Sequence, residues 1–237
     1  MQARAQGMSR RPGERWGQFA GRIGNAFGLV LLLVLATYAL QSLIPYRGWT
    51  AVLTTAVASG AGLSAIASAG VRPRGIRVGV VLALAATALA ILAAVLDDRH
   101  LLGASAFAQM LLLLFAAAAV LRTVLAETEV GFRTILGAIS VYTILGLLFT
   151  FLYAAIDRVQ GDFFGSAVHL EGGDFVFFSF TTLTTTGYGN LVPAGQPGRM
   201  FAGLEMLMGQ IFLVTLVAGL VSLWRPGLLV RDRRGGD

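Results

Sequence analysis

Near the C-terminal end, a short run of threonine, glycine and tyrosine lies between two long apolar segments. Residues 184–190 read Thr-Thr-Thr-Gly-Tyr-Gly-Asn, a composition that suits neither a helix nor a strand. Within a membrane, non-helical backbone occurs only where protein buries it or where it lines a water-filled path. Its carbonyl oxygens, together with a threonine hydroxyl, could then replace the water around a cation. The candidate ligands are Thr185, Thr186, Gly187, Tyr188 and Gly189.

The segment before this Thr-Gly-Tyr run is apolar but too short to cross a bilayer. Residues 174–184 are therefore predicted to form a re-entrant helix that enters from the outside, with Asp174 capping its N-terminus. The C-terminal carbonyls of that helix carry partial negative charge and would face a cation at the membrane centre. Thr181 and Thr184 are candidate supports of the run, and Asn190 is expected at its outer mouth.

The elements that must hold this run are apolar segments, since 56% of the chain is hydrophobic and only 13% is charged. Six segments of roughly 18–25 residues are each long enough to span a bilayer as a helix. They run from Phe27 to Ile44, Ala51 to Ala69, Val78 to Leu96, Leu101 to Val124, Ile135 to Ile156, and Met200 to Leu223. The sequence predicts an all-α membrane protein with six transmembrane helices and the re-entrant helix between the fifth and sixth.

Arginine placement predicts the topology. With six spans, most arginines lie in the termini and connections on one side of the membrane. The positive-inside rule then places both termini in the cytoplasm. We expect the protein to reside in the inner membrane of the cell. The chain divides into a cytoplasmic segment 1–25, a four-helix region 26–125, a pore region 133–224 and a cytoplasmic tail 225–237. Residues 12–25 fit either a short interfacial helix or a disordered tail.

Residues 174–220 resemble the pore module of the two-helix ion-channel superfamily, and more specifically that of bacterial potassium channels. Residues 185–189 match the potassium filter motif Thr-Val-Gly-Tyr-Gly except for Thr186, which stands in place of valine. Ile139 to Asp157 is similar to the outer helix of that family. The resemblance implies that Gly209 is the inner-helix hinge.

Several residues depart from the pattern of that family. Asn190 replaces the aspartate that usually follows the filter, which removes a ring of negative charge at the outer mouth. Thr181 stands where some channels carry an acid, so a carboxylate link behind the filter cannot form. Phe177 and Phe178 replace a frequent tryptophan pair and cannot donate a hydrogen bond from a ring nitrogen.

Glu205 lies inside the sixth span, where an acid is costly and is a functional candidate by default. At 1.5 Å per residue it lies about 9 Å inward from Arg199, level with the Thr-Gly-Tyr run. Two interpretations are open. Glu205 is either a hydrogen-bonded brace to the re-entrant helix, through Ser179 or Thr182, or a proton-sensitive gating residue.

A single Thr-Gly-Tyr run cannot surround an ion, whereas four copies can. We therefore expect a homotetramer, in which three further copies of the chain complete the pore within membrane lipids. The predicted function is passive conduction of K⁺, with K⁺ at the filter carbonyls, no cofactor and no nucleic-acid partner. The alternatives are a weakly selective K⁺/Na⁺ channel, which Thr186 and Asn190 favour, and a non-conducting membrane partner protein. No acid pair, nucleophile–base pair or metal cluster in the sequence indicates an enzyme.

A voltage sensor needs several charges in its fourth span, and that span offers only Arg122. We expect shallow voltage dependence and no soluble sensor domain after the pore. Gating by lipid, pH, tension or a separate regulatory subunit stays open.

Overall fold

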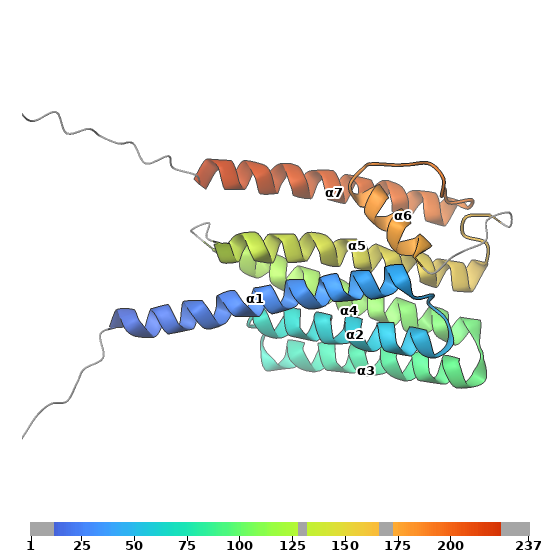
Figure 1. Ribbon diagram of the computed structural model, residues 1–237, viewed down its shortest axis with the longest axis horizontal. Helices are drawn as coiled ribbons and strands as arrows, with labels where there is room; N and C mark the ends of the chain where they lie inside the picture. Colours follow the sequence, from blue (N-terminus) through green and yellow to red (C-terminus); the bar gives the residue numbers. More distant parts are fainter. Residues whose placement is uncertain (1–11, 128–131, 166–172, 224–237) are drawn as a thin grey trace, which may run out of the picture.

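The computed structural model describes residues 12–127, 132–165 and 173–223, which form seven helices and no strand (Figure 1). The all-α prediction is thus confirmed for the described residues. The helices are α1 (Pro12–Leu43), α2 (Gly48–Ser68), α3 (Pro73–Leu96), α4 (Arg99–Ala126), α5 (Phe132–Gln160), α6 (Asp174–Leu183) and α7 (Gln196–Leu223). The predicted tail, 225–237, lies outside the described residues.

Five of these helices, α2, α3, α4, α5 and α7, are long and apolar enough to cross a membrane. The apolar part of α1, Phe27–Leu43, is shorter. This helix begins at Pro12, well before the predicted start at Phe27. Residues 12–25 therefore continue into the first apolar segment as one helix, and the disordered-tail interpretation is wrong. Proline suits the first position of a helix, because the N–H that it lacks would have no helical partner there.

The helices form two groups around α5 (Figure 1). On one side, α4 packs extensively on α5, α2 and α3 pack on α4, and α1 lies against α2 and α5. On the other side lie the short, inclined α6 and the long α7. Among the described helices, α7 contacts only α5 and α6. The position of α6 and α7 thus depends on α5.

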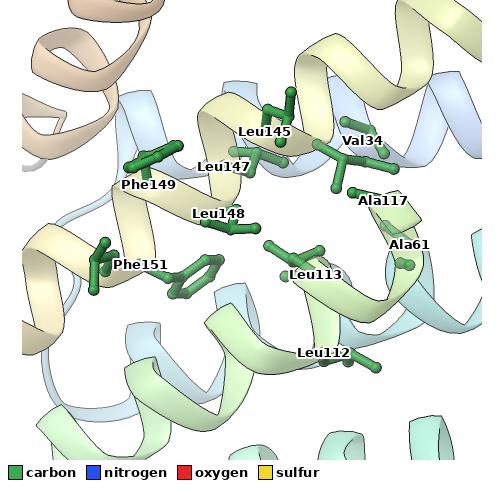
Figure 2. Close-up of a cluster of buried hydrophobic side chains, with 14 of the residues drawn as sticks. Val34, Ala61, Leu112, Leu113, Ala117, Leu145, Leu147, Leu148, Phe149 and Phe151 are labelled. Atoms are coloured by element: carbon green, nitrogen blue, oxygen red, sulfur yellow. The ribbon is translucent and has the colours of Figure 1, made fainter. Parts of the chain in front are cut away.

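The apolar core lies mainly between α4 and α5 (Figure 2). Leu112 and Leu113 of α4 and Leu147 of α5 are completely buried there, and Phe151 is nearly so. The side of α2 that faces this core carries mostly alanine, with Ala58, Ala61 and Ala65 buried. Small side chains let membrane helices approach closely, so α2 can pack tightly on this core. Because the core buries α5, that helix can support α6.

Candidate ion-conduction site

The Thr-Gly-Tyr run follows α6 directly, and its first backbone N–H groups point back at that helix. The Thr185 N–H donates to the Thr182 carbonyl at 2.9 Å. The N–H groups of Thr186 and Gly187 both donate to the Thr181 carbonyl, at 2.8 and 3.2 Å. Because these donors face α6, the structure places Thr181 where it anchors the run through its backbone.

The backbone of the run changes handedness at every second residue. The φ angle is +56° at Thr185, +54° at Gly187 and +79° at Gly189, whereas Thr186 and Tyr188 do not have positive φ. In a regular strand, neighbouring peptide units point to opposite sides. Alternation between left-handed and right-handed residues rotates every second peptide back, so that successive carbonyls can face the same side. Glycine adopts positive φ at no steric cost, whereas β-branched Thr185 does so only under constraint.

Tyr188 and Thr184 contact α6 through their side chains, yet every residue from Thr184 to Asn190 is exposed in the single chain. The Tyr188 ring stacks on Phe177 of α6, with 5.6 Å between ring centroids. The Thr186 hydroxyl lies 2.9 Å from that of Thr184, which in turn donates to the Phe180 carbonyl at 2.7 Å. The Thr186 hydroxyl, a group that valine would lack, therefore has a hydrogen-bond partner in Thr184.

The predicted cap of α6 is wrong by one residue. Gly173 occupies the N-cap position and Asp174 is the first helical residue, where its negative charge still favours the positive end of the helix dipole. Close packing of α1 gives the physical reason. A Cβ at position 173 would lie 2.8 Å from the carbonyl oxygen of Ser42 in α1, so only glycine fits there.

Behind α6, an aromatic cluster takes the place of the tryptophan pair. Phe178 is buried, and its ring centroid lies 5.0 Å from that of Tyr153 in α5 and 5.1 Å from that of Phe164. Phe163 completes the cluster at 6.0 Å from Phe178. Phe177, in contrast, packs on Tyr188, so the two adjacent phenylalanines support the run and the scaffold separately.

Glu205 of α7 is completely buried and joins three helices. Its carboxylate accepts hydrogen bonds from the Ser179 hydroxyl of α6 at 2.5 Å and from the Tyr153 hydroxyl of α5 at 2.6 Å. The Ser179 hydroxyl also lies 2.7 Å from the Gly146 carbonyl of α5. Of the two partners that the sequence left open for Glu205, Ser179 makes the contact with α6. Sequence reasoning missed Tyr153, although a tyrosine within an apolar span signals a buried hydrogen-bond partner.

Gly209 of α7 lies against the last residue of α6. A Cβ at this position would be 2.1 Å from the Leu183 carbonyl oxygen. The same oxygen accepts a hydrogen bond of 3.3 Å from the Tyr142 hydroxyl, and the Tyr142 ring stacks on Phe212 of α7. The lack of a side chain at Gly209 therefore lets the α7 backbone lie directly against the C-terminal end of α6.

The residue after Gly209 reaches the run itself. The amide nitrogen of Gln210 donates to the Thr185 hydroxyl oxygen at 2.8 Å. Nothing in the sequence singled out Gln210, because a glutamine within an apolar span has many possible partners.

Connections outside the run tie it to both neighbouring helices. The Phe163 N–H donates to the Asp157 carboxylate at 3.2 Å, and the Phe163 carbonyl accepts from Ala194 N–H at 2.9 Å. The Arg199 side chain donates to the Pro193 carbonyl at 3.0 Å. The run is consequently held beyond its C-terminal end as well as by α6.

The residues of this site lie in the part of the chain that matches a known protein family. Residues 141–225 match the ion channel family, which confirms the resemblance in the region of α5, α6 and α7. A cyclic nucleotide-gated potassium channel of Rhizobium etli is 36% identical over 91 residues. That alignment covers 38% of this chain and 24% of the relative, so the chain matches about a quarter of that protein. No solved structure matches.

These matches also bear on chemistry. The matched family and relative are channels rather than enzymes, and the family works without a cofactor. The described residues contain no group of three or more side chains that could hold a metal ion.

Proposed function

We propose that this chain forms a homotetrameric channel that conducts K⁺ passively through four copies of the Thr-Gly-Tyr run. The residues proposed to bind the ion are Thr185, Thr186, Gly187, Tyr188 and Gly189. The match to the ion channel family supports a pore in residues 141–225, and the potassium channel relative supports the choice of ion.

The observation that carries this proposal is the backbone of the run. Positive φ at Thr185, Gly187 and Gly189 alternates with the ordinary sign between them, while the first N–H groups are bound to α6. This alternation lets successive carbonyl oxygens face the same side, and we expect that side to be the one opposite α6. Four such rows around one axis would form stacked oxygen cages that replace the water of a dehydrated cation.

The tetramer is supported by what a single chain leaves uncovered. The run is exposed, and so are large apolar side chains of α7, including Leu207, Ile211 and Val214. A single run cannot enclose an ion, and backbone of this kind in a membrane needs protein or water on its open side. Three further copies would supply both the missing oxygens and the cover for α7.

The proposed topology has six spans, with α1 crossing the membrane and α6 re-entrant. At ten residues, α6 is too short to span, and the run that follows it returns toward the start of α7. Both termini would lie in the cytoplasm. Asp174 and Asn190 would then lie near the outer end of the pore, and Gly209 would lie where the inner helix can bend.

A weakly selective K⁺/Na⁺ channel is the second candidate, favoured by Asn190 and Thr186. The bond between the Thr184 and Thr186 hydroxyls weakens this alternative at position 186, because it turns the added hydroxyl toward α6 and away from the ion path. Asn190 lies beyond the carbonyl ligands, so it would affect ion supply at the mouth more than the choice between ions.

The experiment that tests the function is a reversal-potential measurement on the purified full chain in planar bilayers, with K⁺ on one side and Na⁺ on the other. A potential near the K⁺ equilibrium value is expected. A current that reverses near zero would instead support the weakly selective channel. Gly189→Ala should abolish current because its φ of +79° disfavours a side chain.

The matched control for that variant is Gly203→Ala in α7. A Cβ at Gly203 meets nothing within 4 Å and its φ is not positive, so current and selectivity should remain. Absence of cation current from a correctly assembled wild-type protein would contradict the proposed function and favour the non-conducting partner protein.

A further inference from the structure

We propose that Gln210 is a positioning residue that sets the innermost cation site by holding the Thr185 hydroxyl in place. This inference rests on the proposed function, since it concerns how the proposed ion path binds its cation. It assigns a role in ion binding to a residue outside the Thr-Gly-Tyr run.

The contact depends on two adjacent residues of α7. Gly209 has no side chain, so the α7 backbone comes against the Leu183 carbonyl at the end of α6. This close approach brings the next side chain, Gln210, within reach of the run, where its amide nitrogen lies 2.8 Å from the Thr185 hydroxyl oxygen. A bulkier residue at 209 would move the helix away and break this contact.

Thr185 is the residue of the run that most needs such support. Its φ of +56° is unfavourable for a β-branched side chain, and residues in such conformations persist only where their surroundings hold them. Its backbone N–H is held by the Thr182 carbonyl. Gln210 provides the constraint on the side chain, and it acts from a different helix.

The bond leaves the hydroxyl able to bind a cation. A threonine hydroxyl has two acceptor lone pairs and one proton, and the Gln210 amide uses one lone pair. The second lone pair stays available to an ion below the first carbonyl cage. With the donor removed, the Thr185 side chain gains access to other staggered rotamers, and its oxygen is no longer held toward the ion.

The test is block of the K⁺ current by Ba²⁺. Ba²⁺ fits the same oxygen cages as K⁺ but carries twice the charge, so its binding reports on the oxygen ligands. Gln210→Met keeps the length and flexibility of the side chain but removes the donor. The half-blocking Ba²⁺ concentration should rise about fivefold, which corresponds to the loss of a typical hydrogen bond. Gln210→Asn keeps the amide on a shorter stem that cannot reach Thr185, so it should behave like Gln210→Met.

A double-mutant cycle separates this role from general damage. In a Thr185→Val background there is no hydroxyl to hold, so Gln210→Met should cause no further change in Ba²⁺ block. The control is Thr215→Val, because the Thr215 hydroxyl donates within α7, to the carbonyls of Ile211 and Phe212. Its Ba²⁺ block should equal that of wild type.

The outcomes distinguish the two proposals. If wild type conducts K⁺ and Gln210→Met retains wild-type Ba²⁺ block, the positioning role is overturned and the proposed function stands. Equal shifts from Gln210→Met with and without Thr185→Val would also overturn it. A wild-type protein that assembles but passes no cation current overturns both proposals.

Discussion

The helices α5 and α7 both pack on the short helix α6, yet the rest of the chain buries them to very different extents. In its most apolar stretch, 78% of α5 is buried by the rest of the chain, against 17% of α7. Lipid alone does not explain this difference, because α7 is the least apolar of the five helices of spanning length. The rest of the chain thus buries most of α5, whereas it leaves most of α7 uncovered.

The contacts that α7 does make lie along one narrow stripe. Its buried positions among the side chains that the structure describes are Gly198, Ala202, Glu205 and Gly209. This spacing places them on a single face of a helix. Three of the four are small, and the fourth is the acid that bonds to α5 and α6. The α7 helix is therefore attached by close backbone approach and one polar junction rather than by a broad apolar surface.

The largest expected effect comes from breaking the closest point of this stripe. Gly209→Ala would place a methyl group on the Leu183 carbonyl oxygen, which backbone atoms cannot avoid. We expect a loss of about 3 kcal/mol in the stability of the proposed tetramer, in the upper range for overpacking. The measurement is the thermal dissociation temperature of the assembly in K⁺, together with K⁺ flux.

The Gly203→Ala variant on the same helix is the matched control, and it should keep both assembly and flux. If Gly209→Ala changed only the open probability and left the dissociation temperature unchanged, Gly209 would act as a hinge alone, as the family resemblance implies.

The second effect concerns the polar junction that joins the two helices. Glu205→Leu removes the acceptor for Ser179 and Tyr153, and leaves the buried Tyr153 hydroxyl without its partner. A buried group that loses its hydrogen bond costs about 1 to 3 kcal/mol, so the dissociation temperature should fall clearly. The Tyr153→Phe variant should lose less, because it breaks one bond to the carboxylate and leaves the Ser179 bond in place, whereas Glu205→Leu breaks both.

A combined Glu205→Leu and Tyr153→Phe variant sharpens this test. With both ends of the bond apolar, no orphaned hydroxyl remains at Tyr153, and the pair should be less destabilised than the sum of the single variants. Strict additivity would show that the two side chains do not act on each other.

The third effect addresses the exposed face of α7. Leu207 of α7 is 62% exposed and Leu84 of α3 is 65% exposed, so the single chain does not distinguish them. If α7 meets neighbouring copies and α3 meets lipid, Leu207→Trp should disturb assembly while Leu84→Trp is tolerated. Native mass spectrometry in detergent reads the copy number directly, and we expect about 1 to 3 kcal/mol of overpacking for Leu207→Trp alone. Equal tolerance of both variants would place this part of α7 against lipid.

The sequence predicted the features that depend on local chemistry. Residue types and the physics of a membrane interior suffice to predict the Thr-Gly-Tyr run and the short helix before it. They also predict that an acid at Glu205 is costly and needs a partner. Ser179 could be expected as a partner of Glu205 because both lie at one depth.

What the sequence could not predict depends on how separate helices meet. The N-terminus of α6 is set by Ser42 of α1, which requires glycine at 173 and displaces the expected cap. The contact of Gln210 with Thr185 depends on how closely α7 approaches the end of α6 at Gly209. Neither follows from spacing within one segment, because each depends on a partner far away in the sequence.

The smallest expected effect belongs to Asn190, which lies beyond the run and outside the buried stripe of α7. Asn190→Asp would place four negative charges around the proposed outer mouth and raise the local K⁺ concentration there. Since salt screens exposed charges over about 10 Å at 0.1 M, single-channel conductance should rise at low ionic strength and converge with wild type at high salt. The reversal potential should not move, because the carbonyl ligands and their contacts with α6 are unchanged. A shift in reversal potential would instead show that position 190 takes part in the choice between ions, which would extend the site outward past Gly189.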